Sequence, residues 1–99
     1  MVKKSEEIYV LVKLMDNTVL VGRTKTLEGT ELVLEDFRMA VYWDTSTKGL
    51  PGLCSRGPGK GCRVSPSAEI VYIPKKDNVR FYAKITSKAW ASFESEPWG

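Results

Sequence analysis

The segment IYVLVKLMDNTVLVGRTKT, residues 8–26, decides the fold class of this chain. In residues 8–14 an apolar side chain recurs at every second position, which is close to the period of a half-buried strand. Asp16 and Asn17 are residue types that favour a turn. The run 18–26 is rich in β-branched residues, which favour strands. The segment therefore predicts two antiparallel strands joined by a short turn.

The strand pattern continues beyond this segment. A third strand is expected at 31–35, after a turn at Gly29 that separates it from the second strand. A fourth strand is expected at 37–43. In the fourth strand, period-two alternation predicts an apolar face made of Phe37, Met39, Val41 and Trp43. Further along, residues 68–73 and 79–85 resume the strand pattern and are predicted to form a β-hairpin.

A short helix is expected at the C-terminal end of the chain. Thr86 or Ser87 can cap its first turn, and the helix is predicted to continue to about Glu94. Spacings of three and four residues place three apolar side chains on one helix face, Ala89, Trp90 and Phe93. The predicted fold is mainly β: one domain spanning 1–99, with a small bent antiparallel sheet or partly open barrel, a long glycine-rich loop, a β-hairpin and this helix.

Composition excludes several classes of function. The 99 residues are 42% hydrophobic and 27% charged, as in one globular domain, and contain no histidine. Without an imidazole, Ser-His-Asp and Cys-His nucleophile systems and histidine-ligated metals are excluded. Neighbouring carboxylates such as Glu35 and Asp36 point to opposite faces of a strand and make no acid and base couple. We therefore expect a protein that is not an enzyme and has no cofactor.

Location and thiol state follow from the same sequence. The longest apolar runs are far shorter than the roughly 18 residues of a membrane helix, and residues 1–7 lack a signal-peptide pattern. We expect a cytoplasmic protein. Cys54 and Cys62 are too few for a zinc site and are expected to be plain thiols, with a disulfide or redox role as the alternative.

The net charge of +3 is concentrated in residues 44–64. That segment holds four basic residues against Asp44 alone, whereas the rest of the chain carries eleven basic and eleven acidic residues. It also holds five glycines and shows no sustained periodicity, so we expect a long loop. Glycines free backbone N–H groups to meet phosphate oxygens, so the pattern indicates a site for a compact anion and not for duplex DNA.

The candidate ligand-binding residues lie in and just before this loop. Arg38 shares a strand face with Tyr42, and Tyr42 or Trp43 could stack on a nucleobase. The basic and hydroxyl side chains expected to meet phosphate are Arg38, Thr45, Ser46, Lys48, Arg56, Lys60 and Arg63. No catalytic or metal-binding residue is predicted.

These candidate residues could instead serve the fold without contacting a ligand. The loop could be a solvated surface segment, and Trp43 could belong to the core. Arg38 could pair with Asp36 or Asp44, which point the same way. The hydroxyls of Thr45 and Ser46 could bond to their own turn.

Residues 10–23, followed by 32–36, resemble the first motif of Sm-like small barrels, over about a third of the chain. In that motif a strand, a polar turn, a glycine-containing strand and a third apolar strand build a bent sheet. Asn17 stands where Sm-like proteins often have glycine, and their second motif is not visible. Ring assembly and uridine binding are therefore not implied.

A second resemblance covers residues 38–44, the glycine loop through Gly61-Cys62-Arg63, and 85–98. These segments resemble a group of small phage and prophage proteins with an aromatic strand end, a Cys-basic pair after a loop and a short C-terminal helix ending at tryptophan. The loop of those proteins looks more helical, whereas here Gly49, Pro51 and Gly52 are expected to interrupt a helix. The resemblance implies an oligomeric anti-defence sponge, which holds an immune nucleotide signal without destroying it.

Two hypotheses from different classes follow. The first is a non-catalytic, homo-oligomeric binder that sequesters a cyclic oligonucleotide or ADP-ribose derivative and so inhibits host anti-phage defence. The alternative is an Sm-like module that binds single-stranded RNA or a host protein. The first predicts affinity for small nucleotides, and the second predicts salt-sensitive affinity for RNA, or a protein partner.

Overall fold

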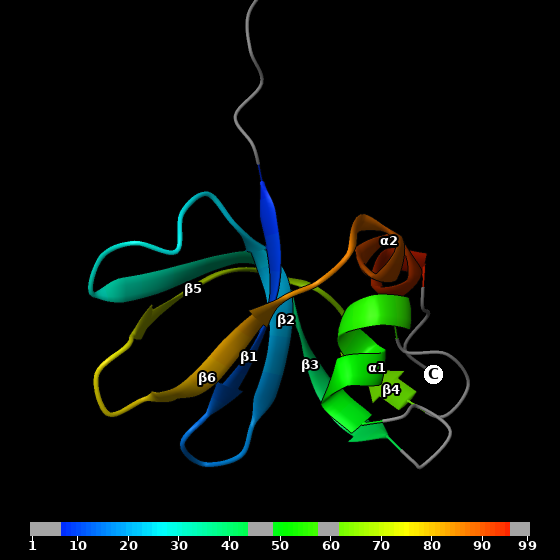
Figure 1. The fold of residues 1–99 in the computed structure, drawn as a ribbon, viewed down its shortest axis with the longest axis horizontal. Coiled ribbons are helices and arrows are strands. Elements are labelled where there is room, and N and C mark those ends of the chain that lie inside the picture. Colours follow the sequence, from blue (N-terminus) through cyan, green and yellow to red (C-terminus); the bar gives the residue numbers. More distant parts are fainter. Residues whose placement is uncertain (1–6, 44–48, 58–61, 96–99) are drawn as a thin grey trace, which may run out of the picture.

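The computed structural model describes residues 7–43, 49–57 and 62–95, which form six strands and two helices (Figure 1). In chain order the elements are β1 (Ile8–Leu14), β2 (Val19–Thr24), β3 (Glu31–Trp43), α1 (Gly49–Arg56), β4 (Cys62–Val64), β5 (Ala68–Pro74), β6 (Val79–Lys84) and α2 (Ser87–Ser95). Neither of these helices is long and apolar enough to cross a membrane.

All strand pairs are antiparallel, and the sheet order is β4-β3-β2-β1-β6. Strand β5 pairs with the first half of β3, from Glu31 to Phe37, while β4 pairs with its last part, from Ala40 to Trp43. The two-strand prediction for residues 8–26 is confirmed by the β1–β2 register, in which Val12 lies opposite Leu20. The mainly β fold class is also confirmed.

The predicted β-hairpin is wrong in its pairing. Strand β5 pairs with β3, and β6 pairs with β1, so the two strands lie at opposite edges of the sheet. Residues 75–78 join these edges: the Lys75 N–H donates to the Thr30 carbonyl at 2.9 Å, and the Asn78 carbonyl accepts from the Met15 N–H at 2.9 Å. A connection this short shows that the sheet is bent until its edges approach each other. The arrangement is a bent, partly open barrel.

The bend is located where β2 crosses β3. The register between these strands shifts between Val21 and Arg23, and Asp36 of β3 has a φ of 48°. A Cβ atom at Gly22 would lie 3.2 Å from the Cβ atoms of both Leu34 and Phe37, so the absent side chain lets the strands approach closely. The predicted strands 31–35 and 37–43 are therefore one strand of thirteen residues with an irregularity at Asp36.

The predicted apolar face of residues 37–43 is wrong as well. Met39 and Val41 are 42% and 51% exposed, whereas Ala40 is buried. The reason is that alternation is interrupted twice, at Asp36 and again between Ala40 and Tyr42, where the register with β4 shifts. Each irregularity moves the following residues to the other face of the strand.

Two cores lie on the two faces of the sheet. The helix-side core is formed where α1 and α2 pack on the sheet, and it includes Leu11, Leu53, Ala89, Trp90 and Phe93. The second core fills the inside of the bend with apolar side chains from β1, β2, β3 and β5, namely Val10, Val12, Leu20, Leu32, Leu34 and Ile73. Figure 1 shows both helices on one side of the molecule, away from the β5–β6 connection.

The long loop predicted for residues 44–64 is partly wrong, because it contains α1 and β4. Pro51 lies in the first turn of α1, where a missing N–H does no harm. Gly57 ends the helix with a φ of 86°, and its N–H donates to the Leu53 carbonyl at 3.1 Å. Gly49, Pro51 and Gly57, which suggested a loop, therefore stand at or near the ends of a helix.

The C-terminal helix is confirmed as predicted. The Ala89 N–H donates to Thr86 Oγ1 at 3.0 Å, which caps the first turn of α2. Thr86 Oγ1 also donates to the Ser55 carbonyl of α1 at 3.1 Å. The same hydroxyl therefore caps one helix and ties it to the other.

Replacing Thr86 with alanine is expected to lower the free energy of unfolding by about 1 to 2 kcal/mol, because both hydrogen bonds are lost. Urea denaturation followed by circular dichroism measures this loss. Thr86→Ser keeps the hydroxyl and should recover most of the stability. A serine variant as unstable as the alanine variant would show that the methyl group, and not the hydroxyl, matters at this position.

Candidate functional site

The exposed end of β3 and its partner β4 hold the most coherent group of the predicted ligand-binding residues. Tyr42 lies directly opposite Arg63 in the β3–β4 register. Opposite residues of an antiparallel pair share a face, with Cβ atoms about 4.5 to 5.5 Å apart. Tyr42 is 55% exposed, and Arg63 is also exposed. The side chains of Tyr42 and Arg63 therefore leave neighbouring positions on one exposed face of the β3–β4 pair.

Trp43 has a different role from its neighbour. It lies opposite Cys62, is half-buried, and packs against the helix-side core. Because successive side chains point to opposite faces of a strand, the same geometry that turns Trp43 inward turns Tyr42 to solvent. Of the two predicted stacking residues, Tyr42 is the accessible one.

Arg38 is held at the end of α2. Its Nη2 donates to the Glu94 carbonyl in the last turn of that helix at 3.3 Å. A cation at a helix C-terminus is favoured by the partial negative charge of the terminal carbonyls. Asp36, the predicted partner of Arg38, accepts from Arg23, with Arg23 Nη2 and Asp36 Oδ2 at 2.7 Å. A phosphate contact for Arg38 stays a prediction.

The other basic candidates are placed only in part. Arg56 is exposed in the last turn of α1, one residue before Gly57, which contacts α2. The side chains of Arg56 and Arg63 form no ion pair or hydrogen bond with another residue of the described ranges. The remaining predicted contacts lie outside the residues that the structure describes: Thr45, Ser46, Lys48 and Lys60. The structure thus brings Tyr42 and Arg63 together and directs Arg38 to a helix end.

Neither cysteine forms a disulfide, and they lie on consecutive elements of the chain. Cys62 is buried in β4 and Cys54 is half-buried in α1. Burial raises the pKa of the Cys54 thiol, so it stays protonated at neutral pH and is a poor nucleophile. Within residues 7–43, 49–57 and 62–95, no three acidic or thiol side chains gather in a way that could hold a metal ion.

A family model described as a domain of unknown function, DUF6948, matches residues 7–93. The chain belongs to the DUF6948 family. The match includes β3, β4, α1 and most of α2, so Tyr42 and Arg63 both lie within the family domain. Comparison with curated proteins and with solved structures gives no match.

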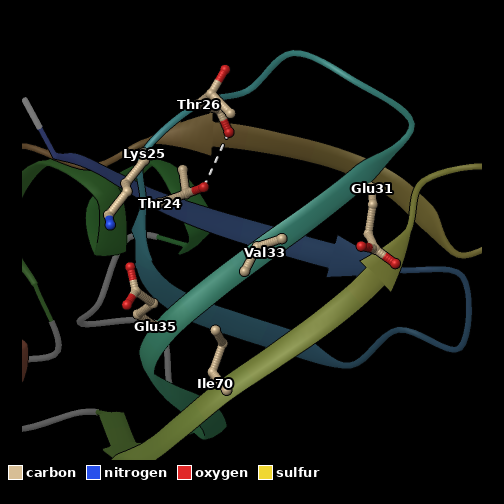
Figure 2. A pocket seen from close by; sticks show the side chains of 7 residues that line it. All are labelled: Thr24, Lys25, Thr26, Glu31, Val33, Glu35 and Ile70. Carbon is tan, nitrogen blue, oxygen red and sulfur yellow. Dashed lines mark hydrogen bonds between the residues drawn. The ribbon is translucent and has the colours of Figure 1, made fainter.

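The DUF6948 chain also has a groove on the outer face of β3 that sequence reasoning missed (Figure 2). Its cavity volume is about 290 Å³, and it is lined by Thr24, Lys25, Thr26, Glu31, Val33, Glu35 and Ile70. Figure 2 shows Glu31 and Glu35 on either side of Val33, along the first part of β3. In the sequence, the period-two spacing of Glu31, Val33 and Glu35 indicates that their side chains share one face of a strand. That Ile70 lies beside them follows only from the β3–β5 pairing. The lining carries both signs of charge, two carboxylates and the Lys25 ammonium group, and so differs from the basic and aromatic Tyr42–Arg63 pair.

Proposed function

We propose that this DUF6948 chain is a non-catalytic binder of a small phosphate-bearing ligand. In this proposal Arg63 contacts phosphate and the Tyr42 ring stacks on a base. The observation that carries it is the juxtaposition of these two exposed side chains across the β3–β4 pair. Stacking on an aromatic ring is worth about 1 to 3 kcal/mol per base, and a guanidinium group suits phosphate oxygens.

Electrostatics supports the same interpretation. The Arg63 side chain has no anionic partner within the described residues. Arg23, in contrast, is neutralised by Glu7 and Asp36. The segment that connects Trp43 to β4, residues 44–61, adds three basic residues against Asp44 alone: Lys48, Arg56 and Lys60.

The class of ligand and the biological role rest on the phage resemblance. They are a cyclic oligonucleotide or an ADP-ribose derivative, sequestered intact so that a host defence signal is removed. A sponge of this kind needs affinity and no chemistry, which fits a sequence that lacks histidine. Assembly into a homo-oligomer and a cytoplasmic location belong to the same proposal.

Substitution of either member of the pair should weaken nucleotide binding. We expect Tyr42→Ala and Arg63→Ala each to raise Kd by about 10- to 100-fold for a cyclic dinucleotide, a cyclic trinucleotide or ADP-ribose, whichever binds. Isothermal titration calorimetry measures the affinities, and native mass spectrometry identifies the bound species. Tyr72→Ala and Arg80→Ala are matched controls, since Tyr72 is 59% exposed on β5 and Arg80 is exposed on β6.

The outcomes separate the hypotheses. Absence of binding to all three nucleotide classes would refute the proposal. Binding of an eight-nucleotide single-stranded RNA, with a steep salt dependence and without affinity for small nucleotides, would instead support the RNA-binding alternative. Equal losses in the Tyr72 and Tyr42 variants would show that the site lies elsewhere on the molecule.

A further inference from the structure

An apolar groove runs between helix α1 and strand β6, on the helix side of the sheet. Its cavity volume is about 570 Å³, and its lining is almost entirely apolar: Leu11, Leu50, Pro51, Cys54, Phe81 and Ala83. Phe81 is 41% exposed, which is unusual for a side chain that faces other apolar groups. A groove of this kind loses unfavourable contact with water when an apolar side chain enters it.

Strand β6 beside the groove is an edge strand. Within the described residues it pairs with β1 alone. The Ile85 N–H donates to the Tyr9 carbonyl at 2.7 Å, and hydrogen-bonded pairs alternate along an antiparallel ladder. The backbone groups of Ala83 and Phe81 therefore face β1, while those of Tyr82 and Lys84 point away from the sheet. These outward groups can accept a further strand.

The charge of β6 determines which kind of strand can pair with its outer edge. β6 carries Arg80 and Lys84 and no acidic residue. If a second copy paired antiparallel through β6 about Tyr82, Arg80 of one copy would lie opposite Lys84 of the other. Like charges directly opposite each other destabilise a strand pair. An acidic segment of a different protein therefore complements β6 better than a second copy of this basic strand does.

We infer that the outer edge of β6 and the groove beside it bind an extended peptide of a partner protein, in which apolar and acidic side chains alternate. Side chains of an added strand point alternately to the two faces of the sheet. On the face of Phe81 and Ala83 they meet the groove, and the small Ala83 side chain leaves room for an apolar group to reach toward α1. On the face of Tyr82 they meet Lys84, and Lys75 Nζ, which lies 5.8 Å from the centre of the Tyr82 ring.

The test uses the full chain and a fluorescein-labelled eight-residue peptide in which glutamate and leucine alternate. Fluorescence anisotropy should show this peptide binding at least tenfold tighter than two controls, a peptide in which lysine replaces glutamate and a peptide with the same residues in two blocks. Hydrogen exchange should slow at the amides of Tyr82 and Lys84 when the first peptide is present. Equal affinity for the block peptide would overturn the inference, because the groove would then bind apolar groups without a strand.

Backbone and charge variants make the test more specific. Two further peptides carry N-methyl groups, one on all the glutamates and the other on all the leucines. Because only alternate amides of an added strand face β6, one of these peptides should bind at least tenfold more weakly than the unmodified peptide, and the other less than twofold more weakly. Lys84→Glu should weaken binding of the glutamate peptide at least tenfold and strengthen binding of the lysine peptide. Lys88→Glu, in α2, should leave both affinities unchanged. Equal effects of the two methylated sets, or of the two lysine variants, would contradict strand addition at β6.

Discussion

Replacing Phe93 with alanine is expected to lower the free energy of unfolding by about 3 to 5 kcal/mol. Phe93 has no exposed surface and lies in the helix-side core with Leu53 and Trp90. Deleting its ring removes apolar contacts and leaves a cavity between α2 and the sheet that the surroundings can only partly fill. Since small domains are stable by only about 5 to 15 kcal/mol, the loss is a large fraction of the total. Urea denaturation followed by tryptophan fluorescence measures it.

Phe81→Ala is the matched control for this variant, because the same atoms are removed from a side chain that is 41% exposed. Its cost should be about 1 kcal/mol, since much of the Phe81 ring is already in contact with water. The slope of the denaturation curve should be unchanged in both variants, which would show that only stability has changed. Comparable losses at Phe81 and Phe93 would contradict the docking of α2 on the sheet.

The elements that could be predicted from the sequence are those whose pattern is local. The alternation in residues 8–14 and the turn at Asp16 and Asn17 gave β1 and β2 with little error. The helix was predicted because Thr86 can cap it and because its apolar face recurs at helical spacing. In both cases the physical cause of the structure lies within a few residues of the element itself.

Features that depend on contacts distant in the sequence could not be predicted. The pairing of β5 and β6 with different strands depends on the bend at Gly22 and Asp36. A bent sheet was predicted, but no local pattern indicated which strands the bend brings together. Helix α1 was missed because glycine and proline occur at the ends of helices as well as in loops, and composition does not distinguish these two positions. Tyr42 and Arg63 were both candidates, but only their register across the β3–β4 pair makes them neighbours.

Gly57→Ala is expected to destabilise the fold by about 2 to 4 kcal/mol, through two separate effects. The first is conformational: Gly57 has a φ of 86°, which an L side chain adopts at a cost of about 1 to 2 kcal/mol. The second is steric, because an added Cβ would lie 2.7 Å from Ser92 Cβ and 3.0 Å from the Ala89 carbonyl oxygen. Since the Ala89 oxygen belongs to the backbone of α2, it cannot move away without displacing that helix.

Gly29→Ala separates the two effects. Gly29 also has a positive φ, 93°, but an added Cβ there would meet no atom within 4 Å. Gly29→Ala should therefore lower the free energy of unfolding only by the conformational cost, about 1 to 2 kcal/mol. The difference between the two glycine variants, measured by urea denaturation, gives the steric cost at the contact between α1 and α2. If the two variants lose equal stability, α2 yields to the added methyl group, and the close contact at Gly57 does not fix the position of the helices.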